Sequence, residues 1–344
     1  MAAVYRLKLL FFFLAKWVGC FYLSRIATRK KIRILCYHNF GTSDEVDWHP
    51  QLFIHSKTFS RRMQYLKRKG YEVASLRQAV DGLANDASGN ANIVITIDDG
   101  WYGIMEHAHP ILSEMKFPYT VYVTSYYSIA DAPVFNLVIP FLFFKSVEGS
   151  VDFCELNVPG VGITAISKER TIKETIRKII EYGEKKDARI RQQLVDGVAK
   201  ILGVDINDIT RRKLFYVMTP EELKSLSEQG VDLQLHTHRH RWPDNKGDAF
   251  EELKLNRKLL FSVQSNETEH FCYPSGYYTK RQFPYLKEAG IKSAVTCKPG
   301  LNHKDTNKYE LRRFLDGENI SQIEFEAEIT GFSDLIRTLR KKIS

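Results

Sequence analysis

Short runs of β-branched and aromatic residues alternate along much of this chain with segments whose apolar residues recur at helical spacing. The clearest run, Ile93 to Ile97, is almost entirely apolar and β-branched, which is typical of a strand buried on both faces of a parallel sheet. Repeated alternation of strand and helix favours an α/β barrel of parallel strands. The site of such a barrel lies at the carboxyl ends of its strands, so residues that directly follow strands are candidates for function.

Strands and helices are predicted over most of the sequence. Besides 93–97, the predicted strands are 32–37, 71–75, 119–124, 231–235, 270–273, 292–296 and about 309–314. The predicted helices are 56–69, 76–84, 107–115, 219–229, 250–260 and 279–289, and residues 85–92 are predicted to form a polar loop. We expect Ser56 or Thr58 to cap the first helix, and Thr219 to form a capping box with Glu222.

The alternation is interrupted between residues 131 and 216. Residues 135–144 are bulky and apolar, 151–164 are predicted to form a hairpin, and 168–202 are charged with helical periodicity. We interpret 131–216 as a helical insertion in a single α/β domain that extends over residues 31–320. An N-terminal amphipathic helix (1–30) precedes this domain and a basic helical tail (321–344) follows it.

The N-terminal segment from Leu9 to Leu23 is apolar and aromatic, but Lys16 interrupts it and it is shorter than the ~20 residues that cross a bilayer. No Ala-x-Ala cleavage site follows it. We favour a helix that lies at a membrane interface, held by apolar burial and by attraction to anionic lipid. A spanning anchor or uncleaved signal, and a helix packed on the protein itself, are the alternatives.

The charge of the chain fits a membrane-proximal protein. Lys and Arg exceed Asp and Glu by 50 to 41, giving a formal net charge of +9, and the excess gathers at both ends of the sequence. We therefore expect an anionic membrane surface as a partner and no nucleic acid, since no nucleic-acid-binding motif is present. The protein would be membrane-associated or cytoplasmic, or extracytoplasmic on an uncleaved anchor. The 5 cysteines have no CxxC spacing, so reduced thiols are expected. The sequence gives no indication of oligomeric state.

Two acidic residues and two histidines follow predicted strands. Asp98 and Asp99 end the strand 93–97, and His236 and His240, four residues apart, follow the strand 231–235. One carboxylate and two imidazoles can hold a divalent metal while the second carboxylate acts as a base, which is the equipment of a metal-dependent hydrolase. Zinc suits this set, and other first-row divalent ions could also bind it. The alternative interpretation is a solvated acidic turn and a polar histidine loop.

These residues resemble the motifs of the polysaccharide deacetylases, the NodB-like homology group also known as carbohydrate esterase family 4. Thr96-Ile97-Asp98-Asp99-Gly100 resembles the first motif, Thr-Phe-Asp-Asp-Gly, with Ile in place of Phe. His236-Thr237-His238-Arg239-His240 matches the second, which is His, Ser or Thr, any two residues, His. The resemblance implies a distorted (β/α) barrel with Asp98 as catalytic base and with Asp99, His236 and His240 as metal ligands.

The third motif, Arg-Pro-Pro-Tyr-Gly, is matched only loosely by Cys272-Tyr273-Pro274-Ser275-Gly276. In the family its Arg steadies the catalytic Asp, and here Cys272 replaces it. Arg313, at the end of the last predicted strand, is a candidate substitute for orienting Asp98.

In the family, a histidine in a C-terminal motif acts as the general acid. This motif is also missing here, because no Leu-x-x-His follows Gly317. Instead, Cys36-Tyr37-His38 resembles the Tyr-His start of the permuted subgroup that deacetylates poly-N-acetylglucosamine. The resemblance to this subgroup implies that His38 is the general acid. The alternative for His38 is a core histidine bonded to backbone.

The resemblance implies a metal-dependent deacetylase that removes the N-acetyl group from an amino sugar in a poly- or oligosaccharide. Asp98 would deprotonate a water, a backbone N–H near Ser275 would stabilise the oxyanion, and His38 would protonate the leaving amine. Residues next to the motifs are candidates for substrate contact: Tyr273, Trp101, Tyr102, Tyr277 and Tyr278. Two alternatives are a deacetylase of a lipid-linked sugar or other C–N amidohydrolase, and an inactive carbohydrate-binding descendant of the fold.

Overall fold

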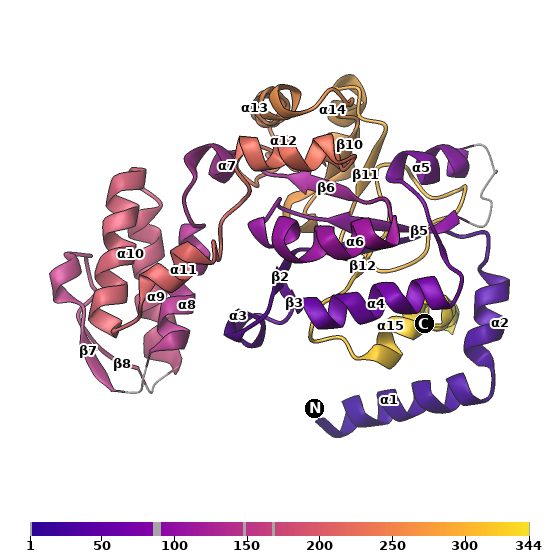
Figure 1. Ribbon diagram of the computed structural model, residues 1–344, viewed down its shortest axis with the longest axis horizontal. Helices are drawn as coiled ribbons and strands as arrows, with labels where there is room; N and C mark the ends of the chain where they lie inside the picture. Colours follow the sequence, from indigo (N-terminus) through magenta and orange to yellow (C-terminus); the bar gives the residue numbers. More distant parts are fainter. Residues whose placement is uncertain (1, 85–90, 147–148, 167–168, 344) are drawn as a thin grey trace. The chain divides into compact units, whose positions relative to one another are not determined.

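An eight-stranded parallel sheet lies at the centre of the unit made by residues 1–129 and 218–344 in the computed structural model (Figure 1). Its strands follow the order β11-β10-β9-β6-β5-β1-β12, and β4 pairs with β5 beside this path. Their bounds are β1 Arg33–Tyr37, β4 Glu72–Val73, β5 Ala91–Ile97, β6 Thr120–Val123, β9 Asp232–Leu235, β10 His270–Cys272, β11 Ser293–Val295 and β12 Phe314–Leu315. The structure describes residues 2–84, 91–146, 149–166 and 169–343. Most of the predicted loop 85–92 lies outside these residues.

The sheet curls back on itself where β11 approaches β12. Val295 forms a parallel bridge with Leu311. The Leu311 N–H donates to the Ala294 carbonyl at 3.0 Å, and the Thr296 N–H donates to the Leu311 carbonyl at 2.8 Å. Because β12 pairs in turn with β1, the strands form a curled half-barrel with helices around it. This arrangement confirms the predicted distorted (β/α) barrel.

The last strand is shorter than the predicted segment 309–314. β12 contains only Phe314 and Leu315. Just before it, the side chain of Asn302 accepts from the Arg312 N–H and donates to the Arg312 carbonyl, each at 2.8 Å. The backbone groups of Arg312 therefore bond to a side chain instead of to a neighbouring strand, and the hydrogen-bond ladder of the sheet is interrupted there.

The predicted helices are present with changes at their ends. Around the sheet lie α3 Asp44–Trp48, α4 Ser56–Arg68, α5 Leu76–Ala84, α6 His109–Met115, α7 Tyr126–Ala130, α12 Pro220–Glu228, α13 Lys246–Val263 and α14 Phe283–Glu288. The capping box between Thr219 and Glu222 forms as predicted. The N-cap of α4 is His55 and neither Ser56 nor Thr58, because the His55 ring accepts from the Lys57 N–H at 3.1 Å.

Short helical turns and two short strands complete this part of the chain. A turn of π-helix, Ile104–Ala108, precedes α6, and the 3-10 turn Lys280–Gln282 precedes α14, so each of these two predicted helices is divided. A further 3-10 turn spans Pro274–Gly276. The strands β2 Asn39–Gly41 and β3 Phe53–His55 pair beside the main sheet.

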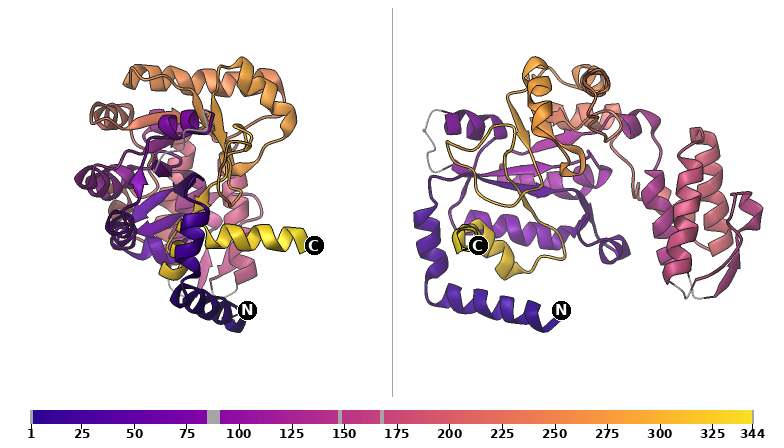
Figure 2. Two further views of the ribbon diagram at one scale, coloured as in Figure 1. Left: turned by 90° about the vertical axis from the view of Figure 1, so that its right-hand side faces the viewer. Right: turned by 180° about the vertical axis from the view of Figure 1, so that it is seen from behind.

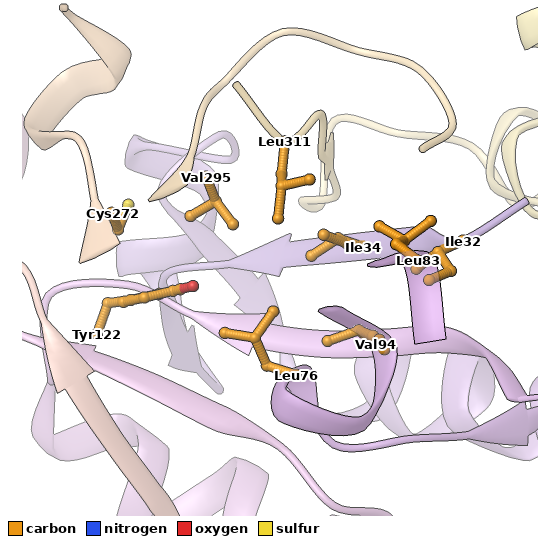
Figure 3. Close-up of a cluster of buried hydrophobic side chains, with 10 residues drawn as sticks. Ile32, Ile34, Leu76, Leu83, Val94, Tyr122, Cys272, Val295 and Leu311 are labelled. Carbon is orange, nitrogen blue, oxygen red and sulfur yellow. The ribbon is translucent and has the colours of Figure 1, made fainter. Parts of the chain in front are cut away.

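A buried apolar cluster fills the inside of the curled sheet (Figure 3). Ile34 of β1, Val94 of β5 and Tyr122 of β6 meet Cys272 and Val295 from the opposite strands there. Side chains on one face of a strand recur every second residue, so the face of β5 that carries Val94 continues through Thr96 to Asp98. The strand pattern therefore directs Asp98 into the same interior, directly above the apolar cluster.

Helices from the two ends of the chain pack on each other beside this sheet. They are α1 Ala2–Trp17, α2 Cys20–Ala27, α15 Gln322–Ile329 and α16 Phe332–Ile343. The apolar stretch 9–23 is divided between α1 and α2, because Gly19 adopts φ 85 and turns the chain by 76°. Phe12, Ala15 and Phe21 pack with Ile323 and Ala327 in a buried cluster. Among the described residues, no single helix meets the length and apolarity needed to cross a bilayer, and α1 with α2 does so only as a bent pair.

Residues 130–217 form a compact unit of their own, separate from the unit made by residues 1–129 and 218–344. It contains α8 Phe135–Lys145, α9 Glu169–Gly183, α10 Ala188–Leu202 and α11 Ile206–Arg211. The antiparallel strands β7 Ser150–Asp152 and β8 Ile163–Ala165 form the predicted hairpin. The helical periodicity predicted in this part of the sequence corresponds to two helices, α9 and α10, and Asp187 caps the second through the Ile190 N–H.

Candidate active site

Four strands of the curled sheet end at one cluster of polar side chains. His38 directly follows β1, Asp98 and Asp99 follow β5, and His236 follows β9. Cys272 is the last residue of β10. Since all these strands are parallel, their carboxyl ends meet at one edge of the sheet, and side chains distant in sequence become neighbours there.

Asp98 forms a buried, bidentate ion pair with Arg313. Its two carboxylate oxygens each accept from one terminal nitrogen of the guanidinium at 2.7 Å, and both side chains are almost fully buried. Arg313 is itself fixed by donating to the Thr296 carbonyl and to the Thr96 hydroxyl. Planar bidentate pairing sets both the position and the rotation of the carboxylate. Arg313 thus makes the contact expected of the arginine that the third motif lacks.

Arg313 also sets the charge of Asp98. Burial alone would raise the pKa of this carboxyl, but the charge and hydrogen bonds of Arg313 lower it to about 2. Two thiols lie against the same oxygen, with Cys36 Sγ 3.5 Å and Cys272 Sγ 3.4 Å from Oδ2. Burial raises the pKa of both thiols well above the usual value, so they remain neutral beside the carboxylate.

Asp99, His236 and His240 bring three ligand atoms together. Asp99 Oδ1 lies 3.1 Å from His236 Nε2 and 3.4 Å from His240 Nε2. Asp99 (φ 72), Thr237 (φ 66) and His240 (φ 54) all adopt left-handed backbone conformations. Such conformations are rare outside glycine, and here they turn the chain sharply after each strand. The Thr237 hydroxyl accepts from the Arg241 N–H at 3.0 Å and stabilises the second turn.

The hydrogen bonds around this cluster fit a bound cation. His236 Nδ1 donates to the Cys272 carbonyl at 2.8 Å, which in a neutral ring leaves a lone pair on Nε2. That lone pair faces Asp99 Oδ1, so two acceptors converge unless a proton or a cation lies between them. Two imidazoles and one carboxylate are a common ligand set for zinc. Among the described residues, three clusters of His, Cys, Asp or Glu side chains have ligand atoms close enough to hold a metal ion. Asp99, His236 and His240 form one of these clusters.

The protonation of these residues follows the same contacts. Burial would raise the pKa of Asp99, but the His236 hydrogen bond and the charges of His240 and His236 lower it well below the usual value. Burial would lower the pKa of His236, but Asp99 and Asp98 raise it overall. Burial lowers the pKa of His240. Asp99 is therefore an anion in the folded protein, as a metal ligand must be.

His38 lies at the open side of the acidic pair. Its Nε2 is 3.9 Å from Asp98 Oδ2, and its side chain is partly exposed. The ring is therefore within reach of both solvent and the Asp98 carboxylate. This position differs from that of a core histidine satisfied by the backbone.

The aromatic and turn residues near the motifs occupy different positions. Tyr273 is fully buried and its hydroxyl donates to the Tyr309 carbonyl at 3.0 Å, so its ring supports the turn that follows β10. Ser275 is exposed in that turn, at φ 54. Tyr277 is 80% exposed, Tyr102 is partly buried, and Tyr278 is half-buried and stacked on Tyr273.

Trp101 is buried, and its indole N–H donates to Asp99 Oδ2 at 2.8 Å. This bond holds one oxygen of Asp99 and leaves Oδ1 directed at the two histidines. A buried ring with its N–H already bonded offers no open face for stacking on a sugar. Trp101 therefore orients Asp99, a role that the sequence alone did not suggest.

Asn256 is a second residue that sequence reasoning missed. It is fully buried in α13, accepts from the His236 N–H at 3.0 Å and donates to the Val123 carbonyl at 2.9 Å. Asn256 thereby ties the end of β6 to the residue that begins the histidine turn. A signal was present, since Asn256 falls between Leu253 and Leu260 on the apolar stripe of the helix.

The sequence profile described as Polysaccharide deacetylase matches residues 163–294. This range includes His236 and His240, while Asp98 and Asp99 lie outside it. The resemblance to polysaccharide deacetylases is confirmed. The structure places a cluster of residues that could hold a metal at the first two motifs.

A curated relative adds sequence similarity over part of the chain. YxkH of Bacillus subtilis, whose name assigns it to the polysaccharide deacetylases, is 24% identical over 114 residues. The match covers 33% of this chain and 41% of YxkH, so this chain spans about two-fifths of the relative's length.

Two solved deacetylase-like structures share the fold. Streptococcus pyogenes deacetylase PplD, in complex with acetate, is 17% identical with a TM-score of 0.56, over 86% of this chain and 96% of PplD. IcaB from Ammonifex degensii is 16% identical with a TM-score of 0.55, over 88% of this chain and 97% of IcaB. At such identities the likeness shows the fold.

If Trp101 orients Asp99, replacing it will weaken metal binding. We expect Trp101→Phe to lower zinc affinity about 10–100-fold, the usual cost of losing a hydrogen bond to a metal ligand. Competition with a chromogenic chelator measures this affinity. Trp17→Phe, at a side chain 85% exposed on α1, is the matched control and should bind zinc normally. Unchanged affinity in Trp101→Phe would contradict this role.

Proposed function

We propose that this protein is a metal-dependent deacetylase that hydrolyses the N-acetyl group of an amino sugar in a poly- or oligosaccharide and releases acetate. The observation that carries the proposal is the different surroundings of two adjacent carboxylates. Asp98 pairs with a buried guanidinium, whereas Asp99 faces two imidazoles. Adjacent acidic residues held in different environments are a pattern of divided catalytic labour.

Asp99, His236 and His240 are the proposed metal ligands, and zinc is the proposed ion. When bound, zinc would supply Lewis acidity that acidifies a water molecule and polarises the acetamide carbonyl. The three residues fit this role by donor type, by convergence of their ligand atoms and by the support that Trp101 and the Cys272 carbonyl give them.

Asp98 is the proposed general base. Its pKa of about 2 keeps it ionised at all working pH values, and Oδ1, which lies away from the two thiols, retains a lone pair beyond its bond to Arg313. A carboxylate this weakly basic removes a proton only from an acidified water, which suits its place beside the proposed metal ligands. Arg313 keeps the carboxylate from rotating away from that water.

His38 is the proposed general acid, and the turn after β10 is the proposed oxyanion support. His38 lies near Asp98 with its ring partly exposed, so it can pass a proton to a leaving amine that enters from solvent. The backbone N–H near Ser275 would stabilise the developing negative charge on the acetyl oxygen. Exposed Tyr277, together with Tyr102, is the proposed contact for a sugar ring. We do not assign Tyr273 or Trp101 to the substrate, because both side chains are buried and bonded.

The family resemblance and one detail of a neighbour support this assignment. PplD is described as a deacetylase in complex with acetate, and acetate is the product that this proposal expects. The presence of Asp98, Asp99, His236, His240 and His38 at one edge of the sheet favours an enzyme over an inactive carbohydrate-binding descendant.

A lipid-linked amino sugar is the second candidate substrate. It is favoured by the exposed apolar side chains of α1 and α2, which belong to the same compact unit as the active site. A lipid-linked amino sugar in a membrane and a free polysaccharide would both present an N-acetyl group to the same proposed catalytic residues.

Acetate release tests the proposed reaction. We expect the purified protein to release acetate from N-acetylglucosamine oligomers, to lose this activity with a chelator and to regain it with zinc. Asp98→Asn should lower kcat/KM by about 10²-fold or more while retaining metal, because it removes the base alone. Asp99→Asn should lose both metal and activity. His303→Ala, at an exposed histidine outside the site, is the control. Active protein without bound divalent metal would refute the proposal.

The role of Arg313 predicts a change in pH dependence. Without the guanidinium, burial raises the pKa of Asp98, and ionisation of the base is lost as pH falls through this higher value. Activity of Arg313→Met should therefore decline towards acid pH much more steeply than that of the wild type, about tenfold for each pH unit below the new pKa. Arg313→Lys, which keeps the charge, should show a smaller change.

Arg312→Met is the matched control, because it removes the neighbouring arginine and leaves the Asp98 pair intact. Its kcat/KM profile should follow the wild type. Circular dichroism will separate loss of folding from loss of ionisation, since breaking a buried ion pair can cost about 3–5 kcal/mol. A uniform loss of activity at every pH in Arg313→Met and Arg313→Lys would contradict the proposal that Arg313 keeps Asp98 ionised.

A further inference from the structure

Exposed apolar side chains gather on the two N-terminal helices. In the described residues, 19 large hydrophobic side chains are exposed, and 12 of them lie between Val4 and Ile26. Trp17 is 85% exposed, and Phe13 is 57% exposed on the same side of α1. Isolated exposed apolar residues are ordinary on soluble proteins, but a continuous cluster of this size marks a binding surface.

Only one side of α1 packs on the protein. Phe12 and Ala15 are buried against α15. Acidic residues of α15 also bind three polar side chains of α1, which are Tyr5, Lys8 and Lys16. These five residues recur at helical spacing and define the inner face of α1. The opposite, outer face carries Arg6, Leu7, Leu10, Phe13, Leu14 and Trp17, all exposed.

The inner contacts hold α1 lengthwise along the protein. Lys8 pairs with Glu324 at 2.7 Å and Lys16 with Glu326 at 2.5 Å, so the helix is fixed at two points more than two turns apart. Both acceptors are nearly buried, which strengthens these pairs relative to exposed ones. Figures 1 and 2 show α1 running along the outside of its unit and turning sharply into α2.

We propose that the outer faces of α1 and α2 form a platform that lies flat in the interface of an anionic phospholipid bilayer. This platform comprises the exposed apolar side chains between Val4 and Ile26, apart from Tyr5 on the inner face, together with the basic residues beside them. It attaches the catalytic unit to one leaflet without crossing the membrane, and it does not depend on the proposed deacetylase activity.

The length of the helices favours a flat arrangement over a spanning one. α1 has 16 residues and α2 has 8, and at 1.5 Å per residue α1 is about 24 Å long, shorter than the ~30 Å hydrocarbon core. To span, the pair would have to straighten its 76° bend and break the contacts of Phe12, Lys8 and Lys16. A flat helix keeps all of these contacts and buries only the outer face.

Charge favours an anionic bilayer over an apolar protein partner. The first 43 residues contain eight Lys or Arg and no Asp or Glu. Arg6 lies on the outer face, and Lys30 is exposed just after α2. The nearby acidic residues Glu324, Glu326 and Asp334 are paired with Lys8, Lys16 and Lys31. Lysine and arginine near an anionic leaflet each contribute about 1 kcal/mol of attraction.

An apolar groove extends this surface. It has a volume of about 700 Å³ and lies between α1, α15 and α16. Leu7, Phe11 and Leu14 line one side and Ile336 the other, with Arg337 and Arg340 beside them. Such a groove provides further apolar area for acyl chains that lie beside the inserted helix.

Vesicle flotation of the full chain, diluted from detergent, tests the platform. The wild type should float with phosphatidylcholine vesicles that contain phosphatidylglycerol, and Phe13→Glu combined with Trp17→Glu should abolish flotation. Phe261→Glu is the matched control, because Phe261 is 60% exposed on α13, away from the platform. Flotation that survives the α1 variant, or is lost equally in the control, would overturn the proposal.

Charge and depth are tested separately. Arg6→Gln and Lys30→Gln should each lower partitioning into anionic vesicles about fivefold, and should change binding to pure phosphatidylcholine little. Lipids brominated near the headgroup should quench Trp17 fluorescence, isolated as the difference from Trp17→Phe, more than lipids brominated at the bilayer centre. Strongest quenching at the centre would overturn the flat arrangement, and a stable oligomer that does not bind vesicles would assign the platform to self-association.

Release of acetate from a soluble oligosaccharide is measured on the same variants. Retained activity in Phe13→Glu with Trp17→Glu shows that the catalytic unit is folded and that only membrane attachment has changed. A protein that floats but releases no acetate would leave the platform supported and the proposed enzyme function refuted.

Discussion

The buried pair of Asp98 and Arg313 is the interaction on which the active site depends. It joins the end of β5 to the segment that closes the sheet at β12, and the curl of the sheet makes this contact possible. A buried carboxylate would normally protonate or leave the interior, and here a fully buried guanidinium holds it ionised in one orientation. Asp99, next in the chain, is thereby free to face the histidines.

Cys272 stands where the third deacetylase motif has its arginine, and Arg313 comes from the segment that leads into β12. Cys272 and Arg313 both lie beside Asp98, with Arg313 Nη2 3.2 Å from Cys272 Sγ. The Arg313 guanidinium reaches Asp98 from the segment just before β12. The small thiol at position 272 leaves room for it and stays neutral because burial raises its pKa.

The sequence predicted those structural features that depend only on residues adjacent in the chain. Each correctly predicted feature lies within one short stretch of sequence. These features are the strand 93–97 with the acidic pair after it, the strand before His236, and the capping box of α12. Arg313 could be named only as a candidate, because its contact with Asp98 depends on closure of a sheet across 215 residues. The role of Trp101 was misread because an aromatic residue beside a motif does not reveal whether its N–H or its face is used. The bend at Gly19 was missed because one glycine within an apolar run is compatible with a straight helix as well as with a break.

The central claim is that Asp99, His236 and His240 hold the metal, and zinc K-edge X-ray absorption of the zinc-loaded protein tests it most directly. Asp98, His236 and Cys272 form a competing group of ligand atoms in the same site. If Asp99, His236 and His240 hold the metal, the spectrum will show nitrogen and oxygen neighbours at ~2.0–2.2 Å, including the scattering pattern of two imidazoles, with no sulfur. A sulfur neighbour at ~2.3 Å would contradict it, because the ion would then be bound by a cysteine and Asp98 could not be the free base.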